Sequence, residues 1–142
     1  MSMDFFAFLG EIPQTNSWQE GVDKLNLPMT INADLSTHTG GLDEFWWRNE
    51  LAMTEIYLVP ISRAGDYLLD KVVLDLKSTQ NRYFVNLHWG GNWREACCAH
   101  ASCAALIEVY DAAVYSAEAG GFMSMADLLT SIQEIEASCA EL

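Results

Sequence analysis

Residues 81–89 read NRYFVNLHW and form the centre of the stretch that decides the fold, residues 65–119. Every second residue from Tyr83 to Trp89 is apolar, which is the pattern of a strand with one apolar face. Residues 67–76 hold another apolar run, and a short polar run separates the two. The two runs therefore predict neighbouring antiparallel strands.

The residues that follow predict a turn, a third strand and a helix. Gly-Gly-Asn at 90–92 suits a hairpin turn, because glycine accepts the positive φ that tight turns need. Residues 93–97 can then return as a third antiparallel strand. Ser102 is expected to cap a helix whose apolar residues, from 106 to 117, follow three-and-four spacing. The glycine pair at 120–121 would stop that helix.

The flanking segments add elements to this unit. Residues 2–9 are apolar and fit either a short helix or a strand, and Ser-x-x-Glu at 17–20 has the form of a capping box. Residues 30–35 predict a short strand, and the β-rich residues 54–59 should pair with the central strands. Ser124 is expected to begin a last helix. The pattern predicts an α+β fold, a mainly antiparallel sheet with helices packed on one face.

Composition indicates one globular domain over residues 1–142. The hydrophobic fraction is 51%, and no apolar run approaches the ~18 residues that span a bilayer. The N-terminus shows no basic region ahead of its apolar residues, so we expect no secretory signal and a cytoplasmic location. The four cysteines fit no common disulfide framework, which agrees with a reducing compartment.

The charge of the chain is strongly acidic. Lysine and arginine number 7 against 20 aspartates and glutamates, a net charge of −13. Direct contact with nucleic acid or with anionic membranes is disfavoured, because both need basic residues. The charge serves either solubility alone or faster association with a basic protein partner.

One cluster could suggest chemistry, namely Cys97, Cys98, His100 and Cys103. Its spacing is not a standard zinc pattern, so we expect no metal and no cofactor. A cysteine nucleophile working with His88 or His100 is conceivable, although no local signature supports it.

The densest aromatic and acidic segment is residues 42–51. Its three consecutive aromatics cannot all point inward from one strand or helix, so either one is exposed or all pack at a sheet edge. The functional interpretation is an interface anchor surrounded by acids, since tryptophan is enriched in binding hot spots. The candidate partner-binding residues are Asp43, Glu44, Trp46, Trp47 and Glu50, with Asp70, Asp75 and Trp93 on the predicted sheet as a further set.

Residues 59–122 resemble the SUKH superfamily of immunity proteins, relatives of the fungal cell-wall-assembly regulators. The resemblance lies in Val59-Pro60-Ile61, Gly65-Asp66-Tyr67-Leu68, Leu74-Asp75-Leu76, the strand with Trp89, Cys98-Ala99-His100-Ala101-Ser102 leading into Leu106-Ile107, and Ala119-Gly120-Gly121-Phe122.

The resemblance implies an α+β fold, no enzymatic activity and the neutralisation of a cognate bacterial toxin. Such toxins are often nucleases or nucleotide-directed enzymes with basic active sites, which an acidic partner can occlude. Two other functions stay open. One is a phage-type acidic inhibitor that mimics nucleic acid, and the other is a small cysteine-dependent enzyme.

Overall fold

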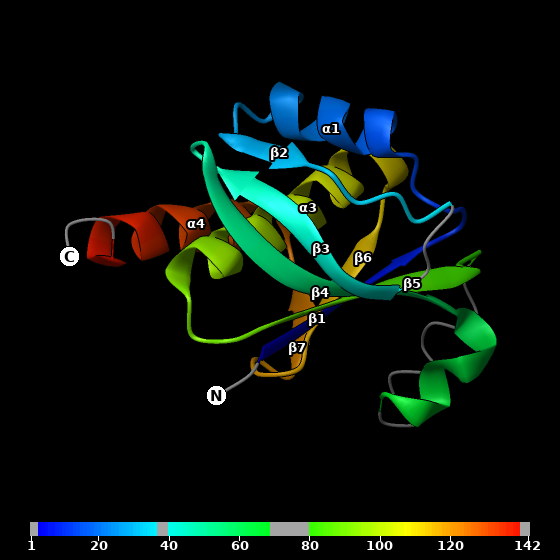
Figure 1. The fold of residues 1–142 in the computed structure, drawn as a ribbon. Coiled ribbons are helices and arrows are strands. Elements are labelled where there is room, and N and C mark those ends of the chain that lie inside the picture. The colour runs from blue at the N-terminus through cyan, green and yellow to red at the C-terminus, as the bar shows by residue number, and fades with distance from the viewer. Residues whose placement is uncertain (1–2, 37–39, 69–79, 140–142) are drawn as a thin grey trace.

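The computed structural model describes residues 3–36, 40–68 and 80–139 (Figure 1). In chain order the elements are β1 (Met3–Leu9), α1 (Thr15–Lys24), β2 (Met29–Ile31), β3 (Gly40–Trp47), β4 (Glu50–Pro60), the 3-10 helix η1 (Ile61–Asp66), β5 (Tyr83–Trp89), α3 (Trp93–Tyr110), β6 (Ala113–Ser116), β7 (Gly121–Met123) and α4 (Met125–Cys139).

The seven strands of the described residues form one antiparallel sheet in the order β2-β3-β4-β5-β1-β6-β7. Helix α3 packs on the sheet, and α1 and α4 pack on α3. One large apolar core fills the space between the sheet and these helices. The predicted α+β fold, with a mainly antiparallel sheet and helices on one face, is confirmed.

Strand β5 confirms the strand predicted at residues 82–89, and it pairs with β4 as expected for residues 54–59. The two described residues of the strand predicted at 67–76 are not in a strand. Tyr67 and Leu68 form a turn and a bend after η1, and residues 69–79 lie outside the described residues. The strand predicted at 30–35 is shorter than expected and covers Met29–Ile31.

The N-terminal segment is a strand, and it lies inside the sheet between β5 and β6. The last five residues of β1, Phe5 to Leu9, are all buried. A strand covered on both faces carries a continuous apolar run without alternation. That run is also compatible with a helix, which is why the sequence left both possibilities open.

Helix α3 begins at Trp93, so the strand predicted at 93–97 is wrong. The Asn92 side chain caps this helix by accepting bonds from the Arg94 and Glu95 N–H groups at 2.9 and 3.4 Å. Residues 90–92 therefore lead into a helix and do not close a hairpin. Ser102, the predicted cap, is fully buried inside the helix.

The end of α3 also differs from the prediction. The helix stops at Tyr110, because Asp111 adopts a left-handed φ of 54° and reverses the chain. Ala113–Ser116 then forms β6 beside β1, where a continuing helix was predicted to 117. Gly120, with φ of 67°, lies in the turn between β6 and β7 and does not end a helix.

The outer helices begin at different kinds of residue. Helix α1 starts at Thr15, one turn earlier than the capping box predicted at 17–20, and no side chain caps it. Helix α4 follows Ser124 as predicted. There the Ser124 hydroxyl accepts a bond from the Asp127 N–H at 3.1 Å, and the Asp127 carboxylate accepts one from the Ser124 N–H at 3.0 Å.

Candidate binding surface

The side of the sheet away from α3 is only partly covered. A second apolar cluster at one end of it contains Phe8, Val59 and Phe84. From η1, Ala64 packs on this cluster, and the ring of Tyr67, just after η1, lies 5.3 Å from that of Phe84. Toward the other end, the side chains of β3, β4, β5 and β1 that face away from α3 are at least partly exposed.

We call this uncovered part the outward face. Its residues are Asp4, Leu42, Glu44, Trp46, Leu51, Met53, Glu55 and His88. Strand β4 shows the two sides of the sheet directly. Leu51, Met53 and Glu55 are exposed or half-buried, whereas the residues between them, and Ile56, are buried.

Apolar side chains are exposed on the outward face. Leu42 is 58% exposed and Leu51 is 47% exposed. Register places the half-buried Trp46 opposite Leu51 and places Met53 opposite Glu44. Large apolar side chains on a partly acidic surface are typical of a protein-binding site.

A polar row crosses the same face. Glu55, His88 and Asp4 stand directly opposite one another on β4, β5 and β1. His88 Nδ1 lies 2.9 Å from Asp4 Oδ1, and His88 Nε2 lies 3.7 Å from Glu55 Oε2. The Asn86 amide donates to Asp4 Oδ1 at 3.2 Å and to the Phe5 carbonyl at 3.1 Å.

The predicted aromatic and acidic segment divides between the two sides of the sheet. Trp46 and Glu44 lie on the outward face, whereas Asp43 and the fully buried Trp47 point toward the core side. Glu50 pairs with Trp47 and is exposed at the end of the hairpin. The expectation that three consecutive aromatics cannot all point inward is therefore confirmed.

The β3–β4 turn is fixed to helix α4. Arg48 and Asn49 adopt φ of 49° and 66°, the left-handed pair that a two-residue hairpin turn requires. Arg48 reaches the Glu136 carboxylate through Nε at 2.7 Å and Nη2 at 2.9 Å, and Trp47 Nε1 donates to Glu136 at 2.8 Å. These bonds lower the pKa of Glu136. The hairpin is thus held in one orientation.

The second predicted set is placed elsewhere. Trp93 is half-buried at the start of α3, with the Arg94 guanidinium 4.5 Å from its ring centroid. It does not belong to the outward face. Asp70 and Asp75 lie outside the described residues.

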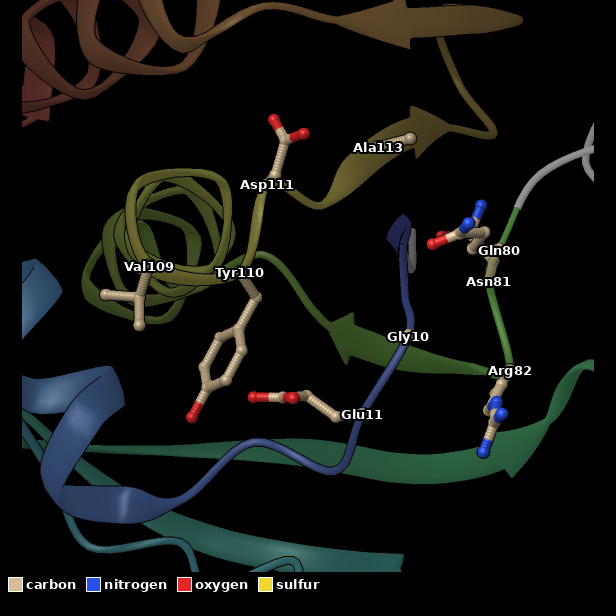
Figure 2. Close-up of a pocket in the computed structure, with 9 residues that line it drawn as sticks. All are labelled: Gly10, Glu11, Gln80, Asn81, Arg82, Val109, Tyr110, Asp111 and Ala113. Atoms are coloured by element: carbon tan, nitrogen blue, oxygen red, sulfur yellow. The ribbon is translucent and has the colours of Figure 1, made fainter.

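A broad hollow of about 1170 Å³ lies where α3 ends and β5 begins. Figure 2 shows Glu11 reaching toward the ring of Tyr110, while Arg82 lies apart from both, beyond Gly10. The Tyr110 hydroxyl accepts a bond from the Gln14 N–H at 2.8 Å and so has a structural role. No histidine, cysteine or serine is among the described residues that line the hollow, so they do not pair a serine or cysteine nucleophile with a histidine base.

The cysteine cluster is internal to α3. Burial raises the pKa of Cys97 to about 12, and it raises the pKa values of Cys98 and Cys103 further. Burial also lowers the pKa of His100, whose Nδ1 lies 2.7 Å from the Ala96 carbonyl. A reactive thiolate would need the opposite shift. Among the described residues, no group of three potential ligands could hold a metal ion.

The sequence interpretation missed most of the outward face. Leu42, Leu51, Met53 and Asp4 were not singled out. Residues 51–56 alternate in burial but not in hydrophobicity, so no period-two pattern in the sequence marks this face. None of the helices in the described ranges is both long and apolar enough to cross a bilayer. No family model, curated protein or solved structure matches the chain.

Proposed function

We propose that this protein is a cytoplasmic immunity protein without enzymatic activity. It binds a cognate bacterial toxin with its outward face and occludes a basic active site on that toxin. The observation that carries the proposal is the exposure of Leu42 and Leu51 beside Glu44 and Glu55 on one sheet face. The resemblance of residues 59–122 to SUKH immunity proteins supplies the class of partner.

The surface chemistry suits a basic protein. Exposed leucines and the half-buried Trp46 offer an apolar anchor, and none of the eight residues of the outward face is lysine or arginine. Acidic groups around an apolar anchor steer a positively charged partner and set its orientation, while the anchor slows dissociation. The chain's net charge of −13 adds long-range attraction.

The two other functions have less support. A nucleic-acid mimic would display a continuous line of carboxylates, but on the outward face apolar side chains and His88 separate them. A cysteine enzyme would need an acidic, accessible thiol, and burial gives Cys97, Cys98 and Cys103 the reverse.

The test is co-expression with the product of the adjacent reading frame in a bacterial host. We expect that product to stop growth alone and growth to resume when this protein is present. Trp46→Ala and Leu51→Ser should weaken protection, whereas Thr130→Ser, at an exposed position of α4, should protect fully. An adjacent product that is harmless, or that binds none of these proteins after purification, would overturn the proposal.

A further inference from the structure

The polar row of the outward face is positioned by backbone pairing. Glu55, His88 and Asp4 come from three neighbouring strands and share one cross-strand line, with Leu42 continuing that line on β3. Directly opposed side chains in a sheet lie ~5 Å apart, so the row needs no loop to bring its groups together.

The side chains of the polar row differ in the hydrogen bonds that they already make within the protein. Asp4 Oδ1 has both Asn86 and His88 within hydrogen-bond distance, which fixes these three side chains. Glu55 Oε2 is 3.7 Å from His88 Nε2, beyond hydrogen-bond distance, and its side chain is 43% exposed. Within the described part of the chain no hydrogen bond to the Glu55 carboxylate is present, so it is available to an external donor.

The surroundings of Glu55 select the kind of donor. Leu42 faces it on β3 with 58% exposure, and Met53 precedes it on the same side of β4. A ligand that fits needs an apolar stem for these side chains and a positively charged head for the carboxylate. Arginine has both, and its planar head can give a carboxylate two parallel bonds, whereas lysine presents a single compact charge.

We infer that Glu55, held beside His88 and Asp4 and flanked by Leu42, is the subsite that receives an arginine side chain of the basic partner. The inference rests on the proposed function for the identity of that partner. The subsite itself can be examined with a small probe in the absence of any toxin.

The experiment titrates the purified full chain with L-argininamide and, in parallel, with L-lysinamide. NMR follows the His88 ring and the backbone amides of β4, β5 and β1. We expect a saturable shift confined to this row, stronger for argininamide and weakened by salt. Glu55→Gln should weaken argininamide binding by about fivefold, while Glu108→Gln, at an exposed position of α3, should leave it unchanged.

Other results of the titration count against the subsite, and comparison with co-expression separates its failure from that of the proposed function. Small shifts spread over all acidic surfaces would mean that only net charge attracts the probe. Equal binding of lysinamide, or equal effects of Glu55→Gln and Glu108→Gln, would overturn the subsite. If the titration succeeds while co-expression shows no protection, the subsite stands and the immunity function fails. If protection depends on Trp46 but the titration gives no saturable shift confined to the polar row, only the subsite fails.

Discussion

Trp46 and Trp47 are adjacent in sequence but should respond to substitution in opposite ways. Trp47 is fully buried and donates a bond to the Glu136 carboxylate, whereas Trp46 is half-buried on the outward face. We therefore expect Trp47→Ala to reduce stability and Trp46→Ala to reduce binding.

The magnitudes follow from burial. Removing a buried tryptophan costs about 3–5 kcal/mol of folding free energy, and losing its bond to a carboxylate adds to that cost. Trp47→Ala should therefore lose about 4 kcal/mol or more, and Trp47→Phe, which keeps a ring but no donor, should lose less. Trp46→Ala should lose about 1 kcal/mol of stability. Because Trp46 is proposed as an interface anchor, Trp46→Ala should also lose at least ~2 kcal/mol of binding free energy. That loss is about 30-fold in affinity, mainly through faster dissociation.

The assay measures urea unfolding and binding kinetics on the same purified variants. Stability is compared at one pH, and binding is measured against the toxic product of the adjacent reading frame. Two results would refute the reasoning: equal destabilisation by Trp46→Ala and Trp47→Ala, or wild-type dissociation of the Trp46→Ala variant. The first would mean that Trp46 belongs to the core, and the second that the interface lies elsewhere.

Three further outcomes are expected. Gly21→Ala should destabilise by about 1–2 kcal/mol in urea unfolding, because its Cβ would lie 2.9 Å from the Ala105 carbonyl oxygen, and this crowding outweighs a helix-propensity gain of about 1 kcal/mol. Gly65→Ala should leave stability unchanged, because a Cβ at residue 65 would meet no other atom within 4 Å. Equal stability of the Gly21→Ala and Gly65→Ala variants would contradict the close packing of Gly21 against Ala105. The hydrogen bonds that Glu136 accepts from Arg48 and Trp47 lower its pKa, so they stabilise the folded state above the unfolded pKa of ~4.3. The difference in stability between wild type and Glu136→Gln should therefore shrink as the pH falls below that value. A difference that does not change with pH would disprove the coupling. The pKa of Cys97 is raised to about 12, so thiol reagents at pH 8 should label it slowly in the native protein and rapidly in urea, and fast native labelling would show that the site is open.

The sequence predicted best where an element carries a distinct local pattern. Alternation identified β5, whose two sides carry different side chains although residues 84–87 are all buried. Ser124 marked the start of α4, where Ser124 and Asp127 exchange hydrogen bonds. The α+β class followed from these elements and their short connections.

The sequence failed where burial removes the periodic signal. Residues 97–106 of α3 are all buried, because the helix lies between the sheet and two other helices. Small residues allow that approach, as the contact of Gly21 with Ala105 shows. Without a polar side there is no 3.6-residue pattern to show where the helix begins. The interpretation of Gly-Gly-Asn at 90–92 as a hairpin turn then placed a strand at 93–97, where the helix has already started. Of the predicted partner-binding residues on β3, Glu44 and Trp46 lie on the outward face and Asp43 and Trp47 do not, since adjacent residues of a strand point to opposite sides of the sheet.

The position of β1 has a consequence for the order of folding during synthesis. The first strand to be made pairs on both sides with late segments, β5 and β6, so the sheet cannot close until Ser116 has left the ribosome. The β3–β4 hairpin is local and can form within microseconds of its synthesis. At ~5–20 residues per second it then waits for several seconds with Phe45 and Trp47 uncovered. The nascent chain is therefore expected to be a chaperone substrate during that interval, even though the finished protein buries both rings completely.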